Sequence, residues 1–136
     1  MTEEIDQDAL EAENARIATE FCKKWEEKNA EALLPYLAEN IFYQMWDADD
    51  AIAVNGKKEF LEMIGPFFET VDKIEFEILR TQCMGKVVIN ERIDRFLRDD
   101  PEMGDWIFPI TGVFIIEDGL IVHWKDYRIP GKPTQM

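Results

Sequence analysis

The hydrophobic pattern of this 136-residue chain changes its period once, near Thr70. Before that point, apolar residues recur every three or four positions, as on one face of a helix. After it, they alternate with polar residues, as along a β-strand. Helices followed by consecutive strands are typical of the α+β class. The pattern therefore predicts a single domain, 1–136, in which helices pack in the concave face of a strongly curved, mostly antiparallel sheet.

The expected elements follow from this change of period. Three segments have helical spacing: 8–28, 30–38 and 57–70. Five runs read as strands: 41–46, 72–82, 85–98, 106–116 and 120–129. Glu117-Asp118-Gly119 is a tight-turn signal that joins the last two strands as a hairpin. We expect a kink at Pro35, a bend or break at Gly65-Pro66, a loop between Trp46 and Lys57, and loose ends at about 1–7 and 130–136.

Composition narrows the classes of function. The net charge of −14 disfavours nucleic acid and anionic membranes, both of which require basic surface. No run of 18 apolar residues could span a membrane, and the acidic start lacks the features of a signal peptide. Cys22 and Cys83 form neither a disulfide framework nor a zinc spacing. We expect a cytoplasmic protein whose partner is a small, neutral, hydrophobic molecule.

Two strands carry charged residues on apolar faces. Asn90, Arg92 and Asp94 share one face of the 85–98 strand, and Trp124 and Asp126 share one face of the 120–129 strand. Buried charges are costly unless they are paired, so a structural salt bridge within the sheet is one interpretation. A single arginine, however, cannot neutralise two nearby carboxylates. Burial and mutual repulsion would keep one of them protonated, which supplies an acid and a base together.

Other polar residues have more modest interpretations. Tyr43 shares a face of its strand with Met45. Its hydroxyl could hold a water beside a carboxylate, or its ring could belong to the core with the hydroxyl at the surface. Alternation places His123 opposite Asp126, at a surface or an interface. Gly112 lies within a strand and indicates a bulge or the close approach of another backbone.

A cluster of aspartates, Asp47, Asp49 and Asp50, lacks the spacing of a calcium loop. We interpret these three residues as part of a solvated loop, and we expect no metal site in the chain.

Several of these residues, taken in order, resemble the limonene-1,2-epoxide hydrolase family. The resemblance rests on motifs that span roughly 8–128: Tyr43, Arg92-Ile93-Asp94, Gly112-Val113-Phe114, Glu117-Asp118-Gly119 and Trp124-Lys125-Asp126-Tyr127. It implies a curved six-stranded sheet packed on helices, the cystatin-like cone of nuclear-transport-factor-2-like and ketosteroid-isomerase-like proteins. It also implies a homodimer that needs neither cofactor nor metal.

The resemblance further implies a reaction in which water opens an epoxide in one step. Asp126 would be the general base acting on water, Asp94 the general acid at the epoxide oxygen, Arg92 the bridge between them, and Tyr43 a partner of the water. Met45, Asn90 and Trp124 would line the pocket or contact the water.

The chain departs from the family pattern at two positions. Met45 stands where the family has an asparagine that contacts the water, and Arg128 stands where a phenylalanine is usual. A thioether accepts hydrogen bonds only weakly, and Asn90 is a candidate replacement for the missing amide. Two alternatives therefore stay open. One is another enzyme of the same cone, of isomerase, dehydratase or polyketide-cyclase type, and the other is a non-catalytic small-ligand binding protein.

Overall fold

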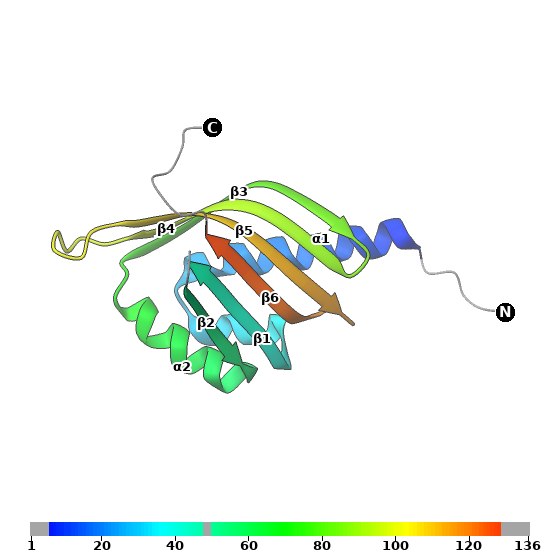
Figure 1. The fold of residues 1–136 in the computed structure, drawn as a ribbon, viewed down its shortest axis with the longest axis horizontal. Helices are drawn as coiled ribbons and strands as arrows, with labels where there is room; N and C mark the ends of the chain where they lie inside the picture. Colours follow the sequence, from blue (N-terminus) through cyan, green and yellow to red (C-terminus); the bar gives the residue numbers. More distant parts are fainter. Residues whose placement is uncertain (1–5, 48–49, 129–136) are drawn as a thin grey trace.

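A strongly curved six-stranded sheet wraps over the helices in the computed structural model of the chain, which describes residues 6–47 and 50–128 (Figure 1). This arrangement confirms the expected α+β class. Asp49 of the aspartate cluster, Ile129 of the last strand and the ends 1–5 and 130–136 lie outside the described residues.

The first expected helix is present in two parts. Helix α1 spans Gln7–Lys24 and begins at Asp6, whose carboxylate accepts a hydrogen bond from the Ala9 N–H at 3.2 Å. A 3-10 helix, η1 (Trp25–Glu27), continues it and ends at Lys28, whose φ of 54° is left-handed. The chain reverses there because a residue in this conformation cannot continue a right-handed helix.

The other two helices differ from expectation in detail. The segment expected at 30–38 is a 3-10 helix, η2 (Ala30–Tyr36), which contains Pro35. Proline has no N–H to donate to a carbonyl one α-turn back, which favours a short 3-10 segment over an α-helix. Helix α2 (Gly56–Glu69) runs through Pro66 without interruption, so the expected break does not occur. None of the helices in the described part of the chain is long and apolar enough to cross a membrane.

The sheet contains the five expected strands and one that the sequence did not indicate. The bounds are β1 Leu37–Asp47, β2 Asp50–Asn55, β3 Lys73–Met84, β4 Val87–Leu97, β5 Trp106–Glu117 and β6 Leu120–Arg128. Their order across the sheet is β2-β1-β6-β5-β4-β3, and only the β1–β6 pair is parallel. The helices contact the concave face, and none of the described helices covers the convex face (Figure 1).

The prediction of a loop between Trp46 and Lys57 was therefore wrong for residues 50–55, which form β2. Strand β2 pairs with β1 in antiparallel register, with Met45 opposite Ile52 and Tyr43 opposite Val54. Val54 is buried, and this pairing outweighs the weak local preference of a short segment that begins with aspartates.

Aromatic rings fill the space between the helices and the sheet. Phe21 of α1 packs edge-on against Trp124 with the ring centroids 5.0 Å apart, and Trp25 stacks on Phe76 at 5.3 Å. Burial of such a ring contributes about 1.5–3 kcal/mol to stability. These contacts hold the inner faces of β3 and β6 against α1 and η1.

Candidate active site

The charged residues predicted on β4 and β6 lie on the concave face of the sheet and are buried. Asn90, Arg92 and Asp94 alternate with half-exposed neighbours along β4, and Asp126 lies on β6. Strand β5 runs between β4 and β6, and its Gly112 pairs with Asn90 on one side and with Asp126 on the other. The sheet register therefore brings residues more than 30 positions apart in the sequence into one row.

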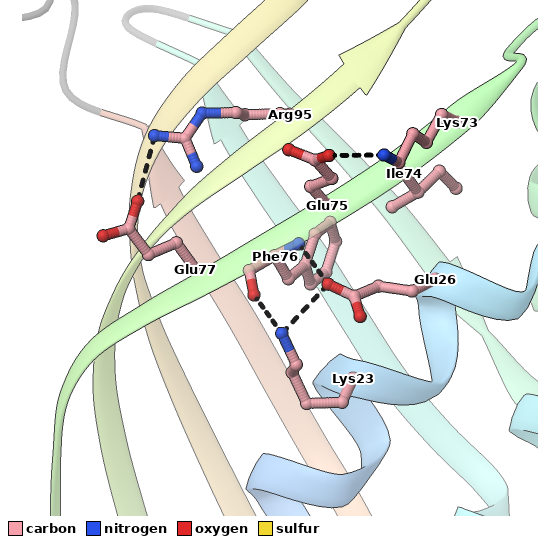
Figure 2. Close-up of a pocket in the computed structure, with 8 residues that line it drawn as sticks. All are labelled: Lys23, Glu26, Lys73, Ile74, Glu75, Phe76, Glu77 and Arg95. Atoms are coloured by element: carbon pink, nitrogen blue, oxygen red, sulfur yellow. Dashed lines mark hydrogen bonds and ion pairs between the residues drawn. The ribbon is translucent and has the colours of Figure 1, made fainter.

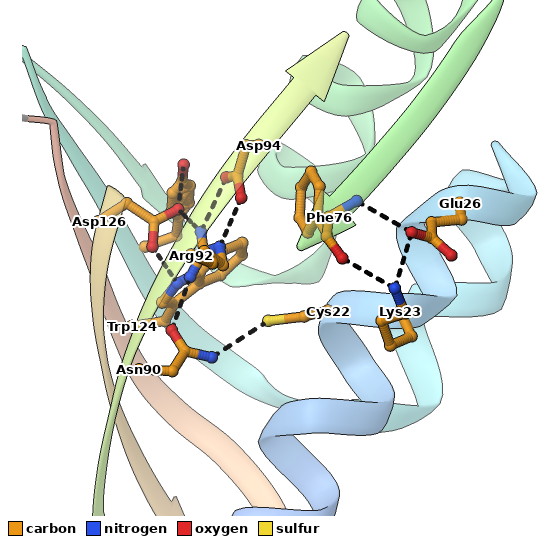
Figure 3. Close-up of polar contacts among 10 residues, drawn as sticks. Cys22, Lys23, Glu26, Phe76, Asn90, Arg92, Asp94, Trp124 and Asp126 are labelled. Carbon is orange, nitrogen blue, oxygen red and sulfur yellow. Dashed lines mark hydrogen bonds and ion pairs between the residues drawn. The ribbon is translucent and has the colours of Figure 1, made fainter. Parts of the chain in front are cut away.

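Arg92 joins the two carboxylates, as the sequence predicted (Figure 3). Its Nε and Nη2 donate to the two oxygens of Asp94 at 2.8 and 3.1 Å. Its Nη2 also lies 2.7 Å from Oδ2 of Asp126. The guanidinium is fully buried, and both acids are almost so. We call Asp94, Arg92 and Asp126 the acid–base network.

Two further side chains hold Asp126. The indole Nε1 of Trp124 donates to Oδ1 at 2.8 Å, and the Tyr43 hydroxyl lies 3.4 Å from Oδ2. Both residues belong to the next row of the sheet, in which Phe114, Trp124 and Tyr43 stack face to face across β5, β6 and β1. This stack fixes the two donors, so the orientation of the Asp126 carboxylate is determined by packed rings.

Asn90 lies behind the arginine and does not line the cavity. Its Oδ1 accepts from Nη1 of Arg92 at 3.0 Å, and its Nδ2 lies 3.6 Å from Sγ of Cys22 on α1 (Figure 3). With both ends of its amide engaged and the side chain fully buried, Asn90 is placed to orient Arg92. Sequence periodicity could not have identified Cys22, because it does not encode how a helix docks on a sheet.

Burial and charge set unequal proton affinities in the network. Burial raises the pKa of Asp94 from 3.8 to about 6; the Arg92 guanidinium opposes this rise and the Asp126 carboxylate adds to it. Burial disfavours the charged form of Arg92, but the two carboxylates outweigh that effect and hold its pKa well above the ordinary value. The pKa of Tyr43 is raised by burial and by Asp126, so its hydroxyl stays protonated and can donate. The network therefore contains a carboxyl that can be protonated near neutral pH beside a permanent cation.

An apolar cavity of about 240 Å³ opens onto the two carboxylates. Among the described residues, its acidic lining residues are Asp94 and Asp126; the others are Trp25, Tyr43, Met45, Ile52, Met63, Ile64, Phe67, Phe76, Phe96, Trp106, Phe108 and Trp124. The volume is below the range usual for drug-sized ligands, so the cavity suits a small molecule. Among the predicted pocket residues, Met45 and Trp124 line it. Its walls from β3, β5 and α2 were not foreseen.

Two of the residues that line the cavity are exposed to solvent: Ile52 of β2, at 61%, and Trp106 of β5, at 41%. We call these two residues the mouth. The ring of Trp106 packs against two side chains: the guanidinium carbon of Arg98 lies 4.1 Å from its centroid, and the ring of Phe67 stacks on it. Arg98 itself donates to the carbonyl oxygen of Thr70 at 2.9 Å. The end of α2 and the start of β5 are thereby tied together at the mouth.

The remaining predicted residues lie outside the cavity. The His123 ring is half-buried against Phe42, on the other side of β6. The guanidinium of Arg128 lies 4.5 Å from the centroid of the Phe108 ring, one of the cavity walls. Gly112 is approached closely, but the three atoms nearest to the position of an added Cβ belong to the side chains of Arg92, Asn90 and Asp126 and not to a backbone.

A second depression, of about 530 Å³, lies over strand β3 at the edge of the sheet (Figure 2). Its charged side chains pair with one another: Lys73 lies 2.9 Å from Glu75, and Arg95 lies 3.0 Å from Glu77. Glu26 accepts from the Phe76 N–H at 2.9 Å, and Lys23 donates to the Phe76 carbonyl at 2.8 Å. Because its polar groups bond to each other, we place the candidate site in the apolar cavity.

Comparison with known proteins identifies a family and a fold. The sequence matches the family model of the limonene-1,2-epoxide hydrolase catalytic domain over residues 12–128, which is most of the chain. No curated protein sequence matches it.

Solved structures of several functional classes share the fold. An LEH-like epoxide hydrolase from M. tuberculosis is similar with a TM-score of 0.72 at 20% identity, covering 87% of this chain and 84% of that one. A putative isomerase from Bacillus subtilis has a TM-score of 0.73 at 20% identity, covering 88% and 89%. A putative SnoaL-like polyketide cyclase from Jannaschia sp. CCS1 has a TM-score of 0.73 at 12% identity, covering 94% and 91%. At these identities the likeness shows the cone fold alone.

Proposed function

Because the chain belongs to the limonene-1,2-epoxide hydrolase family, we propose that it adds water to a small hydrophobic epoxide and releases a vicinal diol. The observation that carries the proposal is the position of Asp94 and Asp126, both bonded to Arg92, where the apolar cavity opens onto them. An epoxide is uncharged and strained, so it fits an oily cavity and needs only an acid and a base to open.

In the proposed reaction Asp126 is the general base and Asp94 the general acid. Water, held by Asp126 and the Tyr43 hydroxyl, gives a proton to Asp126 while its oxygen bonds to an epoxide carbon. The carbon–oxygen bond of the ring breaks, and Asp94 protonates the departing oxygen. Return of one proton from Asp126 to Asp94 resets the pair. Each positioned acid or base of this kind contributes about 10²–10⁴-fold.

The electrostatics of the network support this division of roles. Burial raises the pKa of Asp94 to about 6, so a useful fraction is protonated near neutral pH. Asp126 accepts hydrogen bonds from Trp124 and Tyr43 and pairs with Arg92, so its carboxylate is held in one orientation beside the cavity. A buried pair in such unequal surroundings is the pattern expected of an acid and a base.

A labelling experiment tests the reaction. Small apolar epoxides such as cyclohexene oxide are incubated with the protein in ¹⁸O-labelled water under single-turnover conditions. One labelled oxygen in the diol from the first turnover is expected, because water attacks the carbon directly. An unlabelled diol would indicate a covalent intermediate and contradict the one-step route.

Variants of the two acids complete the test. Asp94→Asn and Asp126→Asn should each lower the rate at least about 100-fold. Glu91→Gln is the matched control, because Glu91 neighbours Arg92 on β4 but faces outward to Arg80. Turnover that is unchanged in both aspartate variants, or absent from the wild type with every epoxide, would reject the proposal.

One feature favours a second candidate function. Met45 lies directly across from Asp126 in the β1–β6 register and lines the cavity, where an amide would give water another partner. A base beside an apolar wall also suits abstraction of a proton from carbon, as in an isomerase. Exchange of deuterium from solvent into a small cyclic enone, without diol formation from epoxides, would support this alternative.

We also propose that the chain is one cytoplasmic domain that works as a homodimer. Both cysteines are free thiols, which suits a reducing compartment. The convex face of the sheet carries exposed Ile107 and Tyr127 and is covered by none of the described helices, so it is available to a second copy. Sedimentation of the purified protein, compared with that of an Ile107→Lys variant, tests the dimer.

A further inference from the structure

Gly112 occupies the point where the side chains of the acid–base network cross the sheet. A Cβ added to it would overlap Nη1 of Arg92 and would lie 2.8 Å from Oδ1 of Asn90 and 3.0 Å from Oδ1 of Asp126. All three partners are buried and hydrogen-bonded, so none can move away without breaking a contact described above. The guanidinium therefore lies across β5 in the space that a side chain at position 112 would fill.

The need for glycine here is steric. The φ of Gly112 lies outside the positive range that favours glycine, so its backbone conformation is open to any residue. Within a strand, glycine is otherwise unfavourable because it packs nothing. A residue that weakens its own strand yet makes room for a buried guanidinium indicates a role in the network.

We infer that Gly112 is a positioning residue for the proposed reaction: its missing side chain lets Arg92 lie between Asn90 and Asp126 and so hold both carboxylates in one geometry. Asn90 completes the arrangement, since it receives Nη1 of Arg92 and is itself held by Cys22 of α1. This inference deepens the proposed function and, where it concerns rate, rests on it.

The test compares two glycine-to-alanine variants. Gly112→Ala forces Arg92 away, whereas Gly65→Ala is the matched control, because nothing lies within 4 Å of the Cβ it would add in α2. With cyclohexene oxide, kcat of Gly112→Ala should fall about 100-fold while KM changes little, since the apolar walls are untouched. Gly65→Ala should keep both constants.

The pH profile separates positioning from general damage. The Arg92 guanidinium lowers the proton affinity of Asp94, so its displacement should raise the pKa of that acid further. The alkaline limb of the kcat profile, where Asp94 loses its proton, should therefore move to higher pH in Gly112→Ala. A merely looser fold would lower the rate without moving this limb.

A spectroscopic readout tests the inference without any substrate. The Arg92 Nε–H bonds to Asp94, and the Trp124 indole N–H bonds to Asp126, so their NMR resonances report on the two acids separately. Gly112→Ala should shift both, and Gly65→Ala neither. Unchanged resonances in Gly112→Ala would overturn the inference. Absence of diol formation by the wild type would reject the proposed function but would not affect this NMR test.

Asn90→Ala guards against failure of Gly112→Ala to fold. It removes the acceptor of Nη1 without adding volume, so it should lower kcat several-fold and shift the Arg92 Nε–H resonance. Because it also vacates space beside Nη1, the double variant with Gly112→Ala should be more active than Gly112→Ala alone. If the loss of activity in the double variant equals the sum of the losses in the two single variants, expressed as free energies, the two residues act independently, which would contradict the shared role.

Discussion

The acid–base network and the mouth border the same cavity but are built differently. Asp94, Arg92 and Asp126 are almost fully buried, and packed rings or buried side chains fix each of them. Ile52 and Trp106 are 61% and 41% exposed, and they come from the edge strand β2 and from the start of β5. The proposed chemistry thus lies where side chains are buried and bonded, and the proposed access lies where exposed side chains can change at low cost.

This difference predicts that substitutions in the network cost both stability and rate, whereas substitutions at the mouth change which molecules react. Buried charges that lose a partner are strongly destabilising, and exposed side chains seldom are.

Arg92→Met should have the largest effect. It leaves two buried carboxylates without their cation, which costs about 3–5 kcal/mol of unfolding free energy and abolishes turnover. Arg95→Met is the control, because Arg95 also lies on β4 but pairs with Glu77 at the surface, where a pair contributes about 1 kcal/mol at most. Urea unfolding of both variants gives the comparison. Equal losses would show that the network is no more constrained than the surface.

The pH dependence of stability should come next. The folded protein binds a proton at Asp94 with a pKa of about 6, against 3.8 for an ordinary aspartate, so ionisation of this group opposes folding. Its contribution to stability is full below about pH 4 and is lost as the pH rises to about 6, by up to about 3 kcal/mol.

The measurement is the unfolding free energy at pH 4.5 and pH 7.5 for the wild type and for Asp94→Asn. The variant lacks the titrating group and should lose less stability over this interval. The same change in both proteins would mean that Asp94 is not a buried acid with a raised proton affinity.

Met45→Asn should have a smaller effect, and in the favourable direction. An amide across from Asp126 could hold the attacking water, which we expect to raise kcat for epoxides about tenfold. Met45→Leu keeps the wall apolar and should give no gain. If both variants behave alike, position 45 does not contact the reacting water, and the isomerase alternative gains support.

Trp106→Ala should have the smallest effect on kcat and the clearest effect on selectivity. Removing the ring widens the mouth, so kcat/KM for a bulky epoxide should rise about 3–10-fold relative to a small one. Ile107→Ala is the control, because Ile107 is 42% exposed but faces away from the cavity. An unchanged ratio in Trp106→Ala would show that access does not depend on this ring.

The network could be predicted from the sequence because alternation along a strand is a local signal. Arg92 and Asp94 fall on one face of β4 by spacing alone, and Asp126 occupies the corresponding face of an equally apolar strand. Charges on apolar strands are costly, so their presence already implied that they meet.

The mouth could not be predicted because it depends on register between distant segments. Ile52 reaches the cavity only through the pairing of β2 with β1, and the sequence suggested a loop there. The role of Gly112 was misread for the same reason: the pattern indicated a close approach but could not say that Arg92 makes it. Contacts between elements, unlike periodicity within one, are a property of the folded chain.

The side chains over strand β3 have a consequence for the behaviour of the protein at high concentration. Phe76 lies on β3, the outermost strand of the sheet. Its carbonyl accepts a hydrogen bond from Lys23, and its N–H donates one to Glu26. An incoming strand from another molecule would find these groups already satisfied at this point (Figure 2). Edge-to-edge pairing of β3 with a strand of another molecule is therefore disfavoured at Phe76.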